Sequence, residues 1–559
     1  MIDRWHRVLA VAEGREPADL VLRDARLVNV ASGEIERVSV AIVAGTIAGV
    51  GDYQAGEREI DLAGSYLAPS FIDAHVHVES SLLWVDAFAR AVVPHGTGAV
   101  VTDPHEIANV AGLPGVRALM GAAVTQPLDL FFTIPSCVPA SALESAGAEM
   151  TPAVIAEGLE LPRVVGLGEM MNFPGVLAGD AEIFATLSLP VARRDGHAPG
   201  LRGPALNAYI ASGIGSDHES TELEEAREKL RRGLKLMIRE GSTERNLLAL
   251  LPLVDDRTYP RCCFASDDRD CATLLHDGHV DAILRKAIAA GLDPIRAIRM
   301  ATLSSAEYWR LPWLGQAAPG YRANLVVFDR LDDLRPRLVL YDGRVVAEDG
   351  RAIFEAPAPV PEWLMQTFHL APVTPEDLKL APHAPMIAVG AIAGQIVTRK
   401  LVVEPTVRDG FVVSDPARDL LKLAAVERHH GTGRVGVGLL AGFGLQRGAL
   451  ATSVAHDAHN VVVTGVDDHD MLVAIGEVAA MEGGLVAVEH GRVLARLPLP
   501  VAGILSPRPL EEVTSAYERL EAVAHELGST VPAPFGLLSF MALSVIPEAR
   551  VTDRGLVTF

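Results

Sequence analysis

Two histidines separated by one residue follow an apolar run in FIDAHVHVES, residues 71–80. Side chains alternate between the two faces of a strand, so His75 and His77 project to the same side. Two imidazoles from one strand end can hold a single metal ion, with Asp73 and Glu79 on the same face. The alternative is a pair of ordinary surface histidines. The preceding apolar strand and the helical segment that follows favour the metal site.

Further polar residues follow other apolar runs: Glu169 in VVGLGEMMNF, His197 in DGHAPG, His218 in IGSDHEST, and Asp267 and Asp268 in FASDDRD. A carboxylate at the end of a buried run is costly unless it is paired or bound to a metal. Taken alone, each residue is better explained as a hydrogen-bonded polar group or a helix cap. Taken in order, the set provides enough ligands for two metal ions that share a bridging carboxylate.

The motif PHEIAN places His105 and Glu106 directly after the apolar run VVTD. It is not the HExxH zinc motif, because its fifth residue is Asn109. Two interpretations remain open for the pair. Either it supports the ligands or faces a substrate, or it forms a structural cap.

A second polar cluster lies far along the chain, where SVAHDAHNVVV contains His456, Asp457 and His459. One interpretation is a hydrogen-bonded turn beside a buried strand. The other is that the domain carrying the cluster packs over a catalytic pocket and contributes these side chains to it. Closing a pocket in this way excludes water and orients a substrate.

The elements that must position the first set of residues alternate between strands and helices over residues 63–319. The strand candidates are LAPSFIDAHV, TGAVVTDP, LDLFFTIPS, VVGLGEM, LPVARRDG and RCCFASDD. SLLWVDAFARAVVPHG, LEEAREKLRRGLKLMIREG and VDAILRKAIAAG show helical periodicity. This alternation predicts an α/β fold, a TIM-like (β/α)₈ barrel that carries its chemistry at the C-terminal ends of the strands.

The flanking segments predict two further domains. Short strands with Gly and Asp-Gly turns occur both before and after the barrel, so residues 1–62 and 320–360 are expected to form one composite β domain. A Pro-rich stretch from about Pro361 indicates a linker. The strands and helices beyond it predict an α+β domain, and we assign residues 361–559 to this C-terminal unit.

Composition narrows the function classes. The formal net charge of −22 disfavours nucleic acid and anionic membrane surfaces as partners, which leaves a small-molecule substrate. The N-terminus lacks the apolar core of a signal peptide, and no apolar stretch reaches the length of a membrane span. None of the four cysteines forms a CxxC pair. We therefore expect reduced thiols and a cytoplasmic location.

Six motifs of the first 270 residues resemble the bacterial adenine deaminases of the amidohydrolase superfamily: FIDAHVHVESS, VVTDPHEIANV, GLGEMMNFPGV, DGHAPGL, LNAYIASGIGSDHES and FASDDRD. RHHGTGRVGVG and SVAHDAHNVVVTG resemble the C-terminal domain of the same family. The resemblance covers nearly the whole chain. It implies a metal-bearing barrel, a split β domain and an additional C-terminal domain.

The resemblance also implies a function and a set of site residues. The expected reaction is the hydrolysis of adenine to hypoxanthine and ammonia by a metal-activated hydroxide, as in purine salvage. The metal ligands would be His75, His77, His197, His218 and Asp267, with Glu169 as the bridging carboxylate. The resemblance points to a binuclear Mn²⁺ or Fe²⁺ centre, while nitrogen and oxygen ligands also suit Zn²⁺.

Asp267 is the candidate for proton transfer, with Glu169 as a second participant. Adjacent residues at a strand end point in different directions, so Asp268 is expected to support the site or to contact substrate. Substrate contacts are also expected from His105, Glu106, His456, Asp457 and His459. We expect a homo-oligomer, a dimer or larger.

Two alternatives remain. The same site could act on an N6-substituted adenine or a cyclic amide, or the chain could be a non-catalytic metal-binding relative. Zinc deaminases of the HxE…PCxxC type are excluded because the sequence has no PCxxC motif.

Overall fold

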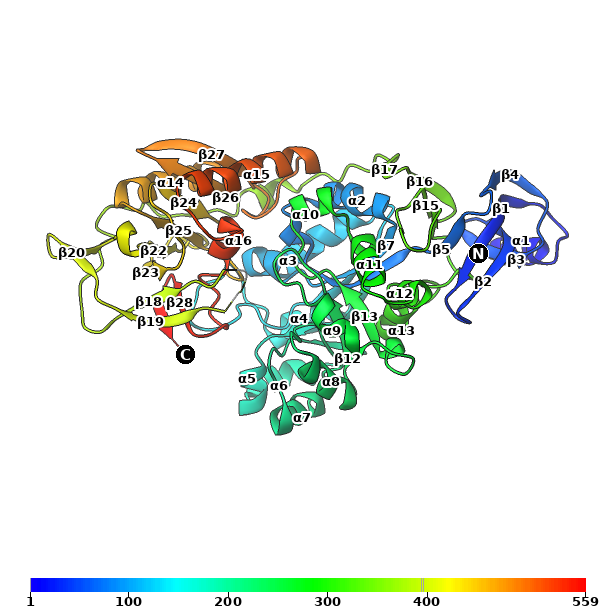
Figure 1. Ribbon diagram of the computed structural model, residues 1–559, viewed down its shortest axis with the longest axis horizontal. Coiled ribbons are helices and arrows are strands. Elements are labelled where there is room, and N and C mark those ends of the chain that lie inside the picture. The colour runs from blue at the N-terminus through cyan, green and yellow to red at the C-terminus, as the bar shows by residue number, and fades with distance from the viewer. Residues whose placement is uncertain (1, 394, 396, 559) are drawn as a thin grey trace.

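The computed structural model describes residues 2–393, 395 and 397–558. Figure 1 shows three units in a row, with a small sheet at the N-terminal end, a strand–helix barrel in the middle and the C-terminal domain at the far side. The chain enters the barrel from the small sheet and returns to that sheet before it reaches the C-terminal domain.

The small sheet has nine strands drawn from both sides of the barrel. They are β1 (Ala18–Asn29), β2 (Glu34–Val43), β3 (Thr46–Gly51), β4 (Gly56–Asp61), β5 (Tyr66–Pro69), β14 (Leu325–Phe328), β15 (Leu338–Tyr341), β16 (Arg344–Glu348) and β17 (Arg351–Ala352). The helix α1 (Ile2–Ala12) packs on this sheet through Val8 and Val11. Strands from both sides of the barrel therefore share one sheet.

The run LAPSFIDAHV is not a single barrel strand. Its first part, β5, pairs with β1 and β14 in the small sheet, and its second part begins the barrel at Phe71. Ser70 lies between them, where its N–H donates to Asn324 O while the N–H of Phe71 donates to Gly96 O. The chain therefore crosses from one sheet to the next at this residue.

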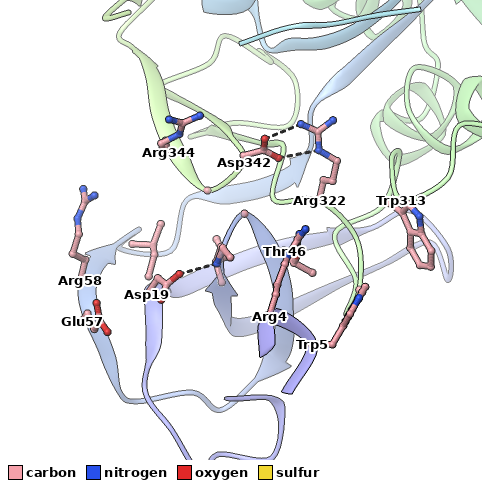
Figure 2. Close-up of a pocket in the computed structure, with 16 residues that line it drawn as sticks. Arg4, Trp5, Asp19, Thr46, Glu57, Arg58, Trp313, Arg322, Asp342 and Arg344 are labelled. Carbon is pink, nitrogen blue, oxygen red and sulfur yellow. Dashed lines mark hydrogen bonds and ion pairs between the residues drawn. The ribbon is translucent and has the colours of Figure 1, made fainter. Parts of the chain in front are cut away.

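A pocket of about 750 Å³ lies between α1, the small sheet and the segment that carries Trp313 (Figure 2). Arg322 lines it and binds both carboxylate oxygens of Asp342 at 2.9 Å. Arg322 also lies 2.5 Å from Asp129, the first residue of the barrel strand β8. This pocket therefore lies toward the N-terminal ends of the strands, away from the end where barrel chemistry occurs.

Eight strands build the barrel and confirm the predicted fold class. They are β6 (Phe71–Val76), β7 (Thr97–Thr102), β8 (Asp129–Ile134), β9 (Val164–Met170), β10 (Arg194–Gly196), β11 (Ser216–Asp217), β12 (Lys235–Arg239) and β13 (Cys262–Ala265). Pairing within the sheets β10-β9-β8-β7-β6 and β11-β12-β13 is parallel. Backbone hydrogen bonds between His75, His77 and Asp267 join β6 to the end of β13.

Helices surround these strands. They are α2 (Val85–Val92), α3 (His105–Ala123), α4 (Pro152–Leu159), α5 (Phe173–Ala178), α6 (Ala181–Leu187), α7 (Gly203–Ala211), α8 (Leu223–Arg231), α9 (Leu247–Leu250), α10 (Cys271–His276), α11 (Val280–Ala289), α12 (Pro294–Met300) and α13 (Leu303–Trp309). The 3₁₀ turns are η1 (Val78–Ser81), η2 (Val93–His95), η3 (Leu251–Leu253) and η4 (Tyr259–Arg261).

The helix predicted over LEEAREKLRRGLKLMIREG is wrong in its second half. Helix α8 ends at Arg231, and Gly233 takes a φ of 102°, a conformation that favours glycine. The following KLMIR forms β12, whose residues are all buried. A strand covered on both faces is continuously apolar and lacks alternation, so its sequence resembles a buried helix. Arg239 is therefore the last residue of a barrel strand.

The C-terminal domain is α+β, as predicted. Its eight-stranded sheet contains β18 (Met386–Gly390), β19 (Arg399–Val403), β22 (Leu420–Val426), β23 (Val435–Ala441), β24 (Ala449–Thr452), β25 (Val461–Gly465), β26 (Gly484–Glu489) and β27 (Arg492–Pro498). Its helices are α14 (Asp468–Ala480), α15 (Leu510–Glu526) and α16 (Pro534–Ser539), with η6 (Pro416–Arg418) and the hairpins β20 (Thr406–Arg408)–β21 (Phe411–Val413) and β28 (Ala549–Thr552)–β29 (Gly555–Thr558). The Pro-rich connection, residues 353–385, contains η5 (Glu362–Met365).

The C-terminal domain holds the barrel loop that follows β8. The Asp553 carboxylate accepts hydrogen bonds from Ser145 N at 2.9 Å and from Ser145 Oγ at 2.7 Å. The side chain of Asn460 donates to Ser145 O, and the hydroxyl of Thr552 donates to Leu143 O. This loop extends from the C-terminal end of a barrel strand, so the contact fixes one wall of the barrel mouth.

Among the described residues, no helix is both long and apolar enough to cross a bilayer.

We predict that Asp553→Ala loosens residues 141–150 because two buried donors of Ser145 lose a charged acceptor. Hydrogen bonds to charged groups contribute about 1.5–3 kcal/mol each, so the net loss of even one of them corresponds to roughly 10- to 100-fold faster opening. Amide hydrogen exchange of the loop measures this change. Glu404→Ala, at an exposed acidic residue of the same domain, is the control. Equal exchange of this loop in Asp553→Ala and wild type would contradict the prediction.

Candidate active site

The predicted metal ligands converge at the C-terminal end of the barrel. They come from the ends of five strands and the residues just beyond: His75 and His77 (β6), Glu169 (β9), His197 (β10), His218 (β11) and Asp267 (β13). Each lies inside or within two residues of its strand. Side chains at these ends point into the barrel mouth, where residues distant in sequence can share a ligand.

The first ligand group forms around the two histidines of β6. Their Nε2 atoms lie 3.1 Å apart. Asp267 Oδ1 is 3.4 Å from His75 Nε2 and 3.2 Å from His77 Nε2. Glu169 Oε1 is 3.7 and 3.2 Å from the same two nitrogens. Two nitrogens and two oxygens therefore face a common point.

The second ligand group uses the other oxygen of Glu169. Its Oε2 lies 2.6 Å from His197 Nδ1 and 3.2 Å from His218 Nε2. Glu169 thus stands between two pairs of histidines and presents one oxygen to each pair. Its neighbours His197 and His218 outweigh the effect of burial and hold the pKa of Glu169 well below its usual value.

The donor set fits divalent cations. His218 is buried, and neither of its ring nitrogens makes a hydrogen bond with the described residues, although a buried polar atom normally has a partner. Burial disfavours a charged His75, but Asp195, Asp267 and Glu169 raise its pKa well above the usual value. The site therefore attracts positive charge, and neutral imidazoles with carboxylates suit Mn²⁺, Fe²⁺ and Zn²⁺.

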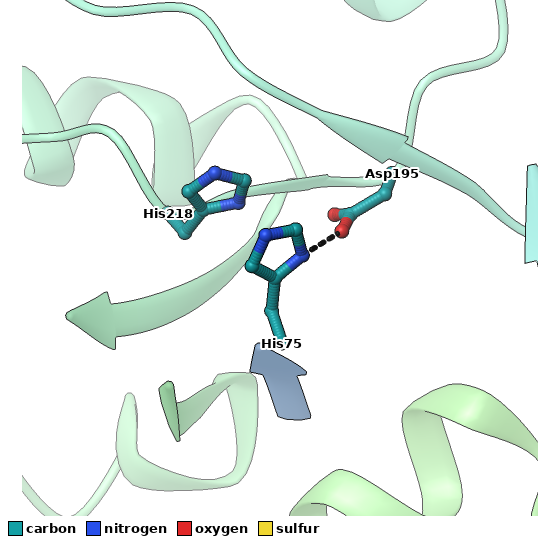
Figure 3. Close-up of side chains that lie close together, drawn as sticks. All are labelled: His75, Asp195 and His218. Atoms are coloured by element: carbon teal, nitrogen blue, oxygen red, sulfur yellow. Dashed lines mark hydrogen bonds and ion pairs between the residues drawn. The ribbon is translucent and has the colours of Figure 1, made fainter. Parts of the chain in front are cut away.

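Two groups that the sequence analysis did not single out orient the β6 histidines. Asp195 Oδ2 lies 2.7 Å from His75 Nδ1, and the carbonyl oxygen of Asp103 lies 2.8 Å from His77 Nδ1. Figure 3 shows Asp195 beside one edge of His75, while His218 stacks on its ring at 4.0 Å between centroids. Such partners fix the tautomer and leave Nε2 free for a metal. Asp195 lies two residues before His197, a spacing that could have suggested it.

A buried arginine engages the last ligand. Arg239 Nη1 donates to Asp267 Oδ2 at 2.7 Å, and the same guanidinium pairs with Glu219. Burial opposes the charge of Asp267, but Arg239, His75 and His77 together outweigh it and hold the pKa of Asp267 well below its usual value. Arg239 was missed because its strand was predicted as helix. Asp268 accepts a hydrogen bond from the Ser80 hydroxyl.

The predicted substrate contacts gather around a small pocket of about 50 Å³ above these ligands. Its lining includes His105, Glu106, Asp268, His456 and Asp457, together with Phe540 and Leu543 of the C-terminal domain. The pocket is thus lined by the barrel on one side and by the C-terminal domain on the other.

Glu106 connects the two sides of this pocket. Its Oε1 lies 2.5 Å from His456 Nδ1 and 3.3 Å from His105 Nε2. Its Oε2 is hydrogen-bonded to His459 Nε2. The three histidines overcome the effect of burial and hold the pKa of Glu106 well below its usual value. His459 therefore lies behind Glu106, whereas His456 and Asp457 line the pocket itself.

Asp73 and Glu79, which the sequence places on the same face as the β6 histidines, form contacts with other groups. Asp73 Oδ1 accepts from Ser266 N, and its Oδ2 lies 3.1 Å from His279 Nε2, deeper in the barrel. Glu79 Oε1 accepts from the N–H of Ile107. Burial raises the pKa of Glu79 to about 7.

Comparison with known proteins yields two family models. Residues 66–346 match the amidohydrolase family, and residues 395–559 match the adenine deaminase C-terminal domain. An adenine deaminase of Dehalococcoides mccartyi is 50% identical over 99% of this chain and 97% of its own length. Adenine deaminase 2 of Carboxydothermus hydrogenoformans is 46% identical over 98% of this chain and 97% of its own. A solved structure described as an adenine deaminase is 18% identical, covers 59% of this chain and 99% of its own, and has a TM-score of 0.46.

The resemblance noted in the sequence is therefore confirmed by identity along almost the full length of curated relatives and by both family models. The chain belongs to the adenine deaminase family of the metal-dependent amidohydrolases.

Proposed function

We propose that this chain hydrolyses adenine to hypoxanthine and ammonia. The observation that carries the proposal is Glu169, which stands between two histidine pairs beneath a pocket that the C-terminal domain completes. The names of relatives at 45–50% identity over nearly the whole chain support adenine as the substrate.

We propose two divalent metal positions, filled by Mn²⁺ or Fe²⁺ and also accessible to Zn²⁺. His75, His77, Asp267 and Glu169 Oε1 would hold one ion, and His197, His218 and Glu169 Oε2 the other. A metal pair bound there would lower the pKa of a water molecule and supply hydroxide at neutral pH.

The protein's own groups would then manage the protons. Deamination at C6 requires a proton for a ring nitrogen and another for the departing ammonia. The ion pair with Arg239 keeps Asp267 in its carboxylate form, which is the form that can accept a proton. We assign proton transfer to Asp267, with Glu169 as a second participant.

His105, Glu106 and His456 would bind and orient the base. Burial opposes a charged His105, but Glu106 and Asp457 raise the pKa of His105 to about 10 despite the nearby His77. A protonated imidazole at the pocket wall can donate a hydrogen bond to a purine ring nitrogen. The C-terminal domain would exclude water from this pocket while it holds Glu106 in place.

We further propose that the protein is located in the cytoplasm and forms a homo-oligomer.

The metal-loaded protein is predicted to convert free adenine to hypoxanthine, with loss of adenine absorbance and release of one ammonia per adenine. Adenosine should be a far poorer substrate, because the relatives are free-base deaminases by name. Removal of the metals by a chelator should abolish turnover, and Mn²⁺ or Fe²⁺ should restore it. Comparable kcat/KM values for adenosine and adenine would overturn the assignment of the free base.

We predict that Asp267→Asn lowers kcat by about 10²–10⁴-fold, the contribution typical of a general base. The replacement has the same shape, so circular dichroism should remain that of the wild type. Asp268→Asn is the matched variant and should have a much smaller effect, because Asp268 bonds Ser80 rather than the ligand cluster. An inactive Asp268→Asn beside a fully active Asp267→Asn would reverse the two roles.

His456→Ala should raise KM or lower kcat with unchanged metal content, because Glu106 loses one of the groups that hold it. His456→Asn should recover part of the loss, since its amide can approach Glu106 from the position of Nδ1. His459→Ala should act in the same direction by freeing the other oxygen of Glu106. His383→Ala, at an exposed histidine, is the control. Wild-type kinetics in both alanine variants would leave the cluster with a structural role only.

A further inference from the structure

Two residues form a doorway between the metal pocket and a neighbouring pocket. Glu244 and Phe540 line both the metal pocket and an outer pocket of about 270 Å³. Glu244 belongs to the barrel loop after β12, and Phe540 directly follows α16 of the C-terminal domain. The doorway therefore lies between the two domains, and none of the proposed metal ligands lines the outer pocket.

Glu244 carries an unused acceptor at this doorway. Its Oε2 accepts a hydrogen bond from the Thr243 hydroxyl. The residue is partly exposed, yet its Oε1 is sealed from solvent and makes no hydrogen bond with the described residues. Burial raises the pKa of Glu244 to about 7, while the positive charge of Arg239 acts in the opposite direction. An oxygen left without a donor, on a residue that lines a binding pocket, is suited to a donor from a ligand.

Phe540 limits the width of the same doorway. Its ring stacks on His456 with centroids 4.5 Å apart and an angle of 11° between the planes. His456 is in turn held by Glu106. The aromatic wall is therefore anchored to the barrel, and a flat ring fits against it better than a branched group does.

The chemistry of adenine matches this arrangement if the proposed function holds. C6 must lie at the metal ligands, and the imidazole N–H of the free base lies on the opposite side of the purine. This N–H is the only ring donor of adenine, and a carboxylate is its natural acceptor. A base substituted at N9 has lost this donor.

We propose that Glu244 is the residue that selects the free base, by accepting a hydrogen bond from the imidazole N–H of the purine. This inference rests on the proposed function. The outer pocket continues beyond the doorway, so a substituent at N9 would meet Glu244 and Phe540 rather than a closed wall. Rejection of N9-substituted bases therefore depends on these two side chains.

The test pairs a change in the protein with the matching change in the substrate. Full-length, metal-loaded wild type, Glu244→Gln and Glu244→Ala are compared on adenine and 9-methyladenine. The wild type should prefer adenine by about 100-fold or more in kcat/KM, because a buried acceptor rejects a ligand that lacks its donor. Glu244→Ala should reduce this preference at least about tenfold, mainly through a higher KM for adenine. Glu244→Gln should fall in between, because its amide oxygen still accepts.

Glu222→Ala, at an exposed acidic residue of the barrel, is the matched control and should keep the wild-type preference. An unchanged preference in Glu244→Ala that still deaminates adenine would overturn the inference. If Glu244→Ala does not fold, the same comparison is made with Glu244→Gln, and an unchanged preference there overturns it equally. A wild type that does not deaminate adenine at all would instead refute the proposed function.

Discussion

The structure depends on one buried carboxylate. Glu169 is almost fully removed from solvent, and an isolated charge there would be strongly destabilising. Four imidazoles, from His75, His77, His197 and His218, lie within 3.7 Å of its two oxygens. These imidazoles reach Glu169 because the strands that carry them all end at the same edge of a closed barrel. Asp195 and the carbonyl of Asp103 then turn the β6 histidines toward it.

The need to pair a buried carboxylate also accounts for the position of the C-terminal domain against the barrel. Glu106 is a second buried carboxylate, and two of its three histidine partners belong to that domain. Removing the domain would leave Glu106 with His105 as its one histidine partner and would expose the pocket to water. The contact between Asp553 and Ser145 fixes the neighbouring barrel loop. The two domains therefore build one site and cannot be treated as a catalytic unit with an appendage.

Local patterns were sufficient to predict much of this arrangement. The HxH spacing and the polar residues after apolar runs singled out side chains that meet at the barrel mouth, because a strand end fixes where its side chains point. Their roles as metal ligands follow from the family resemblance and are a proposal. Three features could not be predicted from local sequence patterns. Residues 235–239 are buried on both faces, so the strand that carries Arg239 lacked a strand-like alternation. The pairing of Glu106 with His456 spans 350 residues, and the placement of Glu244 beside Phe540 likewise depends on how two domains pack.

The central claim is that Glu169 serves two cation positions at once. Metal stoichiometry of the purified protein, measured by elemental analysis beside a Glu169→Gln variant, tests it most directly. The account predicts two divalent ions per wild-type chain and at most one in Glu169→Gln, because the amide offers a single oxygen and no charge. Two ions retained by the variant, or a single ion in a fully active wild type, would contradict it.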